Sequence, residues 1–305
     1  NPTIRSCRPT LRFSRRSSPG PKRTIHACAM IGPARVAAYD ILSAVSAGRA
    51  DLPTAIAHAR ASLADDRDRA LASEISTGVQ RWRAALDHLI VQFSKRPLDR
   101  LDPPIVEILR IGLYQILHLT RVPAPAIVDD AVDMSRRAGK SSASGFVNAV
   151  LRTAVRTRKA VPLPPRPADP ADRDVALEYL SITLSHPRWV VSRWYDRLGF
   201  DVTESWLRFN NEPAPLTLRA NRLRASRDQV QARLETLGVH TRPGQFAPDA
   251  LIVEDGRPTG EDFVIQDEAS QLVTLLAGAM PGALVLDACA SPGGKATALA
   301  AAICL

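Results

Sequence analysis

The residues best suited to bind a small charged ligand lie in the last stretch of the sequence, from Ala283 to Leu305. Four apolar residues, Ala283–Leu286, predict a buried parallel strand. The segment Ser291–Gly294 then predicts a turn, and the alanine-rich residues from Lys295 predict a helix. Such a unit forms the front edge of a ligand site in an open α/β sheet. Its glycines allow close approach, and its helix start offers N–H groups to a carboxylate or phosphate.

Two common nucleotide-binding motifs are absent from this stretch. A phosphate-binding P-loop requires Gly and then Ser or Thr at the positions occupied by Cys289 and Ala296. The fingerprint G-x-G-x-x-G is excluded because Gly293 and Gly294 are adjacent. The remaining run, D-A-C-A-S-P-G-G-K at residues 287–295, resembles the first cofactor motif of the RNA 5-methylcytosine methyltransferases.

The resemblance implies a loop that holds S-adenosylmethionine (SAM). For a bare Pro-Gly-Gly we would favour an ordinary strand–turn–helix connection, but Asp287, Cys289 and Lys295 are also in place. The residues implied to bind the cofactor are Cys289, Ala290, Ser291, Pro292, Gly293, Gly294 and Lys295.

Length and composition limit the number of domains and the kind of protein. At 305 residues and 45% hydrophobic, the sequence predicts about two domains. No apolar run reaches the roughly 18 residues of a membrane span, so we expect a soluble, cytoplasmic protein without membrane contact. The four cysteines show no C-x-x-C spacing, which indicates a reducing compartment and argues against a metal site.

The net charge of +9 arises mainly in residues 1–29, which hold seven basic residues and no acidic ones. We expect this leader to be disordered and dispensable for folding. It could be a transit peptide or an RNA-binding arm, but we favour an over-extended gene model whose true start is Met30. The body is nearly neutral, so any nucleic-acid surface must come from local clustering of basic residues.

Residues 30–158 predict an all-α bundle. Apolar residues at helical spacing predict one helix from Val36 to Val45 and one long stripe from Leu71 to Phe93, capped by Asp66 or Asp68. Further helices are predicted between Pro103 and Pro123, at 126–137 and at 146–156.

Several segments of this bundle resemble the NusB-like domain. They include Ala34-Arg35, Leu109–Gln115 and Gly145–Arg152. We expect Gly78 and Gly112 to permit close helix packing, and Arg110 and Arg152 are candidates to face RNA.

A proline-dense linker at 159–174 should be extended and loosely packed. Residues 175–265 then predict a helical and α+β RNA-binding subdomain in which Trp189, Trp194 and Trp206 are apolar anchors. Pro215–Ala220 alternates like a strand, and further strands are predicted near 239–242 and 250–254. Between them, Asp228–Leu237 predicts a helix that ends at Gly238. Four arginines on the first strand and its turn are the best candidates for phosphate contact: Arg219, Arg222, Arg224 and Arg227.

Residues 266–305 predict the first strand and helix of a Rossmann-like SAM methyltransferase domain, incomplete at Leu305. The segment 263–276 resembles the lead-in helix of that domain, with Asp267 as its N-terminal cap. From Met30 onward the domain order resembles the Sun/RsmB-type 16S rRNA cytosine-C5 methyltransferases. The resemblance implies a monomeric enzyme that transfers a methyl group from SAM to C5 of a cytosine in ribosomal RNA.

The catalytic thiols of that family are not found in this sequence. C5 of cytosine becomes nucleophilic only when a thiolate adds to C6. The family uses one Cys in a Thr-Cys motif for that attack and another in a Pro-Cys motif for product release. Neither pair occurs here, so we expect the catalytic residues downstream of Leu305 and the chain itself to be inactive.

Two other interpretations remain open. The chain could be a non-catalytic NusB-like module that binds RNA or protein, or a different SAM enzyme with a NusB-like front. The Pro-Gly-Gly-Lys loop distinguishes the methyltransferase interpretation from the non-catalytic module, because a pure binding module has no use for such a loop.

Overall fold

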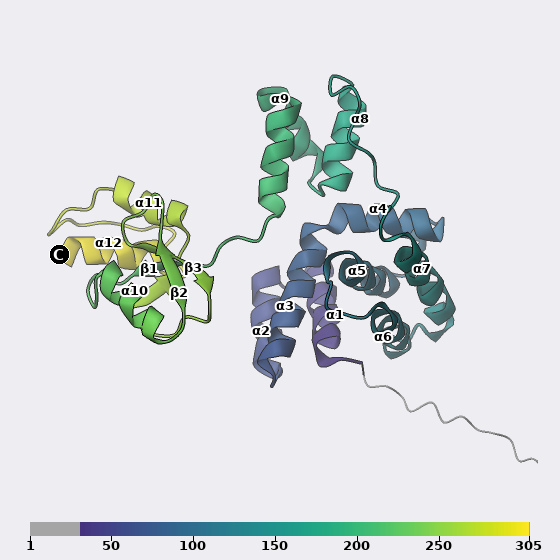
Figure 1. Cartoon of the computed structure of the whole chain (residues 1–305), viewed down its shortest axis with the longest axis horizontal. Helices are drawn as coiled ribbons and strands as arrows, with labels where there is room; N and C mark the ends of the chain where they lie inside the picture. Colours follow the sequence, from purple (N-terminus) through teal and green to yellow (C-terminus); the bar gives the residue numbers. More distant parts are fainter. Residues whose placement is uncertain (1–30, 305) are drawn as a thin grey trace, which may run out of the picture. The chain divides into compact units, whose positions relative to one another are not determined.

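The computed structural model describes residues 31–304, which form two compact units divided after Leu207. The expected disorder of residues 1–29 lies outside the described part of the chain. Figure 1 shows the first unit as helical and the second as a small sheet with helices against it. No helix in residues 31–304 is long and apolar enough to cross a membrane.

The first unit is built around one almost fully buried helix, α5 (Pro103–His118). Its apolar residues pack with those of the neighbouring helices in one continuous core. This all-α architecture confirms the sequence prediction, and α5 begins at the predicted Pro103. The other helices of the bundle are α1 (Pro33–Ser46), α2 (Leu52–Ser62), α3 (Asp66–Arg81), α4 (Arg83–Ser94), α6 (Ala124–Arg137) and α7 (Ser144–Thr157), with 3₁₀ turns at Leu98–Arg100 and Ser141–Ala143.

Three details of the bundle differ from the sequence prediction. The single stripe from Leu71 to Phe93 is two helices, because the backbone of Trp82 leaves helical geometry between α3 and α4. The α3 cap is Asp65, whose carboxylate accepts the Arg67 N–H at 2.7 Å. The α5 helix ends at His118, five residues before Pro123, which instead precedes α6.

Arg110 belongs to the bundle interior and is not available to RNA. The residue is only 6% exposed, and its guanidinium pairs with Asp87 at 2.6 and 2.8 Å and with Glu107 at 2.6 Å. The interpretation of Arg110 as an RNA-facing residue is therefore wrong. The helical periodicity of α5 could not predict that Arg110 is buried. A buried arginine requires carboxylate partners, and one of them, Asp87, comes from another helix.

The proline-dense linker packs against the helical bundle of the first unit, contrary to the prediction of loose packing. Val161 and Leu163 pack on the bundle core. The carbonyl of Pro162 lies 3.1 Å from His88 Nε2, and that of Pro164 accepts the Thr183 hydroxyl at 2.7 Å. The linker thus joins the bundle to the helices that follow it.

Those helices are α8 (Arg173–Glu178), a π-helical turn at Tyr179–Thr183, and α9 (Arg188–Asn211), which is interrupted at Gly199. Their core includes Leu180, Val191 and Leu207. Trp194 packs against this core, but Trp189 and Trp206 are 72% and 49% exposed. The predicted role as an apolar anchor is therefore confirmed for Trp194, against whose ring Trp206 packs edge-on at 6.4 Å, and is wrong for Trp189.

The second unit contains a four-stranded antiparallel sheet in the order β2-β3-β1-β4. One face packs on α10 (Arg227–Thr236), through Leu218, Val230 and Leu234. As predicted, α10 ends just before Gly238. The strands are β1 (Thr217–Ala220), β2 (His240–Pro243), β3 (Ala250–Asp255) and β4 (Phe263–Ile265).

The expected alternation of β1 is not seen, because all four of its residues are buried. Leu218 faces α10, while Arg219 on the opposite face contacts Thr297 of α12 (Gly294–Cys304). The predicted lead-in helix is also shorter. Residues 263–265 form β4, and α11 (Glu268–Leu276) begins after Asp267, which caps it as predicted.

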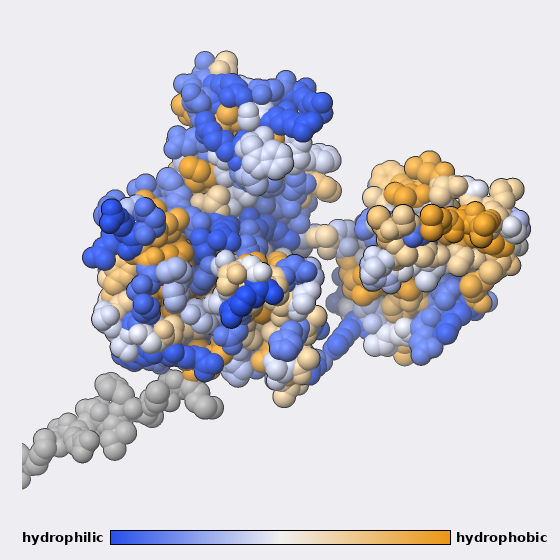
Figure 2. Space-filling view, turned by 180° about the vertical axis from the view of Figure 1, so that it is seen from behind, coloured by the Kyte–Doolittle hydropathy of each residue, from blue (hydrophilic) through white to orange (hydrophobic). Residues whose placement is uncertain are grey.

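The predicted strand at Ala283–Leu286 does not form in the described structure. Leu284 and Leu286 are almost completely exposed, and no strand pairs with them. A parallel strand needs hydrogen-bonded neighbours and helices on both faces, and none is provided for this segment within residues 31–304. Figure 2 shows apolar residues gathered on the surface of the second unit, where Leu276 and Met280 are also exposed.

Candidate cofactor loop and arginine pocket

The glycine loop sits at the start of α12. The backbone of Gly293 has φ +107°, a conformation that disfavours any residue with a Cβ, and the Ser291–Pro292 peptide is cis. The first backbone hydrogen bond of the helix runs from the Thr297 N–H to the Gly293 carbonyl at 2.9 Å. The N–H groups of residues 294–296 therefore have no partner within the helix and are available to an anion.

Asp287 lies at the other side of this loop. One of its carboxylate oxygens accepts the Cys289 N–H at 3.0 Å. Its second oxygen, Oδ2, is buried and has no hydrogen-bond partner among the described residues. Cys289 and Lys295 are exposed. The loop thus combines unpaired backbone donors with one unpaired buried acceptor, which suits a ligand that carries groups of both kinds.

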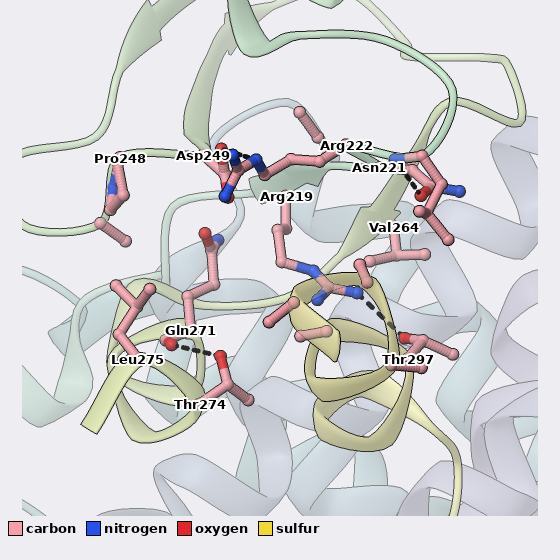
Figure 3. A pocket seen from close by; sticks show the side chains of 17 residues that line it. Arg219, Asn221, Arg222, Pro248, Asp249, Val264, Gln271, Thr274, Leu275 and Thr297 are labelled. Atoms are coloured by element: carbon pink, nitrogen blue, oxygen red, sulfur yellow. Dashed lines mark hydrogen bonds and ion pairs between the residues drawn. The ribbon is translucent and has the colours of Figure 1, made fainter. Parts of the chain in front are cut away.

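A cavity of about 290 Å³ lies between the sheet and the last two helices of the second unit (Figure 3). Arg219 of β1 extends across it and donates from Nη2 to the Thr297 hydroxyl at 3.0 Å. Gln271 of α11 and Asp249 before β3 also line the cavity. The sequence motifs gave no sign of this pocket, because it is formed by residues far apart in the sequence, such as Arg219 and Thr297, which are 78 positions apart.

Burial dominates the electrostatics of this pocket. It lowers the pKa of Arg219, and the nearby carboxylate of Asp249 only partly opposes that effect. Burial likewise raises the pKa of Asp249, against the influence of Arg222, Arg219 and Arg227. Within residues 31–304, Arg219 Nε has no hydrogen-bond partner. Arg219 is therefore placed inside the unit, unlike the other arginines of its group.

Three of the remaining RNA candidates form ion pairs near the surface, where Arg222 and Arg224 are exposed and Arg227 is half-buried. Arg222 Nε is 4.0 Å from Asp249, Arg224 is 2.7 Å from Glu261, and Arg227 is 2.9 Å from Asp228. Arg152 belongs to the first unit, on α7, where it donates to Asn148 at 2.8 Å. Exposed ion pairs of this kind contribute little to stability, so these guanidinium groups can exchange their partners for phosphates. Among the described residues, no cluster of His, Cys, Asp or Glu could hold a metal ion.

Comparison with known proteins identifies two regions of the chain, neither of which extends to the cofactor loop at residues 289–295. Residues 32–156 match the NusB family, and residues 186–259 match the ferredoxin-like domain of RsmF/B-like methyltransferases. The chain therefore contains a NusB-family domain, as its sequence motifs predict, followed by a region that matches the ferredoxin-like domain of RsmF/B-like methyltransferases.

Curated relatives are similar to most of this chain. Ribosomal RNA small subunit methyltransferase B of Pseudomonas putida (strain KT2440) is 34% identical over 86% of this chain and 58% of the relative. The protein of the same name from Xylella fastidiosa (strain 9a5c) is 34% identical over 87% of this chain and 59% of the relative. The chain thus spans a little over half the length of these curated relatives.

The fold is also similar to a solved structure. The crystal structure of PH0851 superposes with a TM-score of 0.64 at 22% identity, over 90% of this chain and 61% of that one. The similarity supports the fold of each unit taken by itself.

Proposed function

We propose that this chain is the N-terminal portion of a SAM-dependent enzyme that methylates C5 of a cytosine in small-subunit (16S) ribosomal RNA. The domain order supports this proposal, because a NusB-family domain precedes a ferredoxin-like domain of RsmF/B-like methyltransferases. So do the names of the two relatives described above. We further propose that the protein is a cytoplasmic monomer whose partner is ribosomal RNA.

One observation carries the cofactor proposal: the left-handed glycine that precedes the free N–H groups of α12. When bound, SAM supplies the methyl group that is transferred. Residues 289–295 would hold it, with the N–H groups at the start of α12 directed to its carboxylate. Asp287 Oδ2, which is buried and has no partner within residues 31–304, would accept a hydrogen bond from an ammonium or hydroxyl group of the same molecule.

The second unit would contribute to RNA binding through its exposed arginines. Arg222, Arg224 and Arg227 lie on the loop after β1 and at the start of α10. Contacts of this kind to phosphates position the RNA and carry no sequence information. Arg152 on α7 would add a contact from the NusB-family domain.

We propose that the 305-residue chain binds RNA without modifying it. The chain contains no Thr-Cys or Pro-Cys pair, so the two thiols that the family resemblance requires are not supplied by its own residues. Its role is to present RNA and to form one wall of the cofactor site.

A chimaeric enzyme tests this function directly. Residues 31–304 would replace the matching part of the P. putida relative, and 5-methylcytosine in 16S rRNA would be quantified by nucleoside mass spectrometry. We expect methylation at C5, strongly reduced by Gly293→Ala, since alanine is strained at φ +107°. Gly145→Ala is the matched control, because a Cβ at Gly145 meets no atom within 4 Å.

Two outcomes would contradict the proposal. A folded chimaera that binds 16S rRNA but leaves it unmodified would favour the non-catalytic module. Methylation at another atom of the base would favour a different SAM enzyme with a NusB-like front.

A further inference from the structure

A line of hydrogen bonds connects the sheet of the second unit to the glycine loop. Arg219 Nη2 donates to the Thr297 hydroxyl at 3.0 Å (Figure 3). This hydroxyl in turn donates to the Gly293 carbonyl at 2.8 Å. The same carbonyl accepts the Thr297 N–H at 2.9 Å. The glycine with left-handed φ is therefore fixed at its carbonyl by two bonds from Thr297, whose rotamer is in turn fixed by Arg219.

Stability does not explain why an arginine occupies this position. Arg219 is 8% exposed, and its Nε has no partner within residues 31–304. Its only hydrogen bond to a side chain is to a neutral hydroxyl, and no ion pair forms at its guanidinium within 4.0 Å among the described residues. A buried charge compensated so weakly stabilises a fold less than an apolar residue of similar volume would.

The contacts of Thr297 explain the position instead. A threonine hydroxyl on a helix commonly bonds to the carbonyl four residues earlier, but it can rotate away from it. A donor placed on the outer side of the hydroxyl oxygen makes one rotamer preferable, because the oxygen then accepts from Arg219 while its hydrogen points to Gly293. Arg219 comes from a strand paired on both sides, so the donor has a rigid support.

We propose that Arg219 is a positioning residue that acts through Thr297 to hold the Gly293 carbonyl, and with it the loop at residues 289–295, in a single conformation. The ligand of this loop rests on the proposed function, whereas the hydrogen bonds and their test do not require the ligand. Arg219 thereby differs in role from Arg222, Arg224 and Arg227, which face solvent.

The test measures the order of the loop in the full chain without any ligand. Protein labelled with ¹⁵N-glycine would be studied by NMR relaxation, and the Gly293 amide compared with that of Gly256, which lies in the turn after β3. Three variants are needed: Arg219→Met removes the donor, Thr297→Val removes the hydroxyl at constant shape, and Thr297→Ser restores the hydroxyl.

We expect Gly293 to be as ordered as the helices in the unaltered protein and in Thr297→Ser. In Thr297→Val and Arg219→Met it should become mobile, while Gly256 does not change. The melting temperature of Arg219→Met should stay within about 2 °C of the starting value or rise, since an apolar side chain tolerates burial better than the guanidinium.

Either of two results would overturn the proposal. If Gly293 is unchanged in Arg219→Met, the arginine does not position the loop. If Gly293 and Gly256 both become mobile and the melting temperature falls, Arg219 supports the sheet as a whole. Because SAM is absent from the assay, a failure to bind SAM would contradict the proposed function and leave this result intact.

Discussion

The hydroxyl of Ser185 accepts a hydrogen bond of 2.9 Å from the backbone N–H of Ala84, 101 residues earlier in the chain. Ala84 lies in the first turn of α4, where backbone N–H groups lack partners within the helix. No side chain at the helix start supplies a cap, so a residue from the segment before α9 does so. This bond connects the helices after the linker to the bundle within the first unit.

Replacing Ser185 should therefore destabilise the first unit. We expect Ser185→Ala to lower the free energy of unfolding by about 1 kcal/mol, the usual cost of losing a helix cap. Chemical denaturation followed by circular dichroism measures it. Ser205→Ala is a suitable control, since Ser205 is exposed on α9 and bonds only to the Asp201 carbonyl of the same helix. Equal stabilities of the two variants would contradict the capping role.

The close packing of α3 on α5 leads to a prediction about stability at Gly78. A Cβ added at Gly78 would lie 1.9 Å from the Tyr114 ring, which is fixed by a 2.6 Å hydrogen bond to Glu74. Gly78→Ala should cost about 1–3 kcal/mol through overpacking, although alanine has the higher helix propensity. Gly145→Ala, with open space at its Cβ, should change stability little. A stable Gly78→Ala protein would show that Tyr114 can move.

The stack around His118 predicts a pH effect. His118 lies between the rings of Trp82 and Tyr114, at 4.9 and 5.0 Å. Burial lowers its pKa, with Glu74 opposing, so the folded state favours the neutral ring. Its contribution to stability is present above the ordinary histidine pKa of about 6.5 and is lost as the pH falls below that value.

His118→Phe should keep the stack but remove this dependence. Melting temperatures measured from pH 7.5 to pH 5 should decline less in the variant than in the unaltered protein, by an amount set by this one group. Parallel curves for the two proteins would show that His118 does not titrate differently in the folded and unfolded states.

The sequence predicted the starts, ends and caps of helices where a single local signal determines them. Pro103 marked the start of α5, Gly238 followed the end of α10, and Asp267 capped α11, because these signals act over a few residues. The close approach at Gly78 was also predictable, since a glycine in a strong helix suggests a packing contact. The family resemblance predicted a NusB-like domain, and residues 32–156 match the NusB family.

Burial of individual polar residues was not predictable in this way. Arg110 and Arg219 were both interpreted as surface residues, but each is buried by elements distant in sequence. The contact of Arg219 with Thr297 spans 78 residues, so no local period records it. Trp189 shows the converse error, because a large apolar residue on a helix need not have anything packed over it.

Arg222, Arg224 and Arg227 yield a prediction about RNA. Replacing all three with alanine should weaken binding to a 16S rRNA fragment and lower the slope of log K against log salt by about one unit per lost phosphate contact. Glu261→Gln, which frees Arg224 from its 2.7 Å partner, should act in the opposite direction. Filter binding between 50 and 300 mM salt would measure both effects. An unchanged slope in the triple variant would show that these arginines are solvated and do not contact RNA phosphates.

The cysteines give the last prediction, which concerns catalysis. Cys289 and Cys304 are both exposed and free, so either thiol is accessible to a pyrimidine base. Accessibility is not sufficient, however, because attack on C6 also requires the base to be held against the sulfur. The Cys289 N–H is bonded to Asp287 within the proposed cofactor loop, and Cys304 lies at the end of α12. We therefore expect no covalent adduct when the chain is incubated with SAM and 16S rRNA that contains 5-fluorocytosine.

Denaturing gel electrophoresis of the labelled RNA measures whether such an adduct forms. The complete P. putida enzyme is the positive control, and an adduct that disappears in Cys289→Ser or Cys304→Ser would assign catalysis to that residue instead.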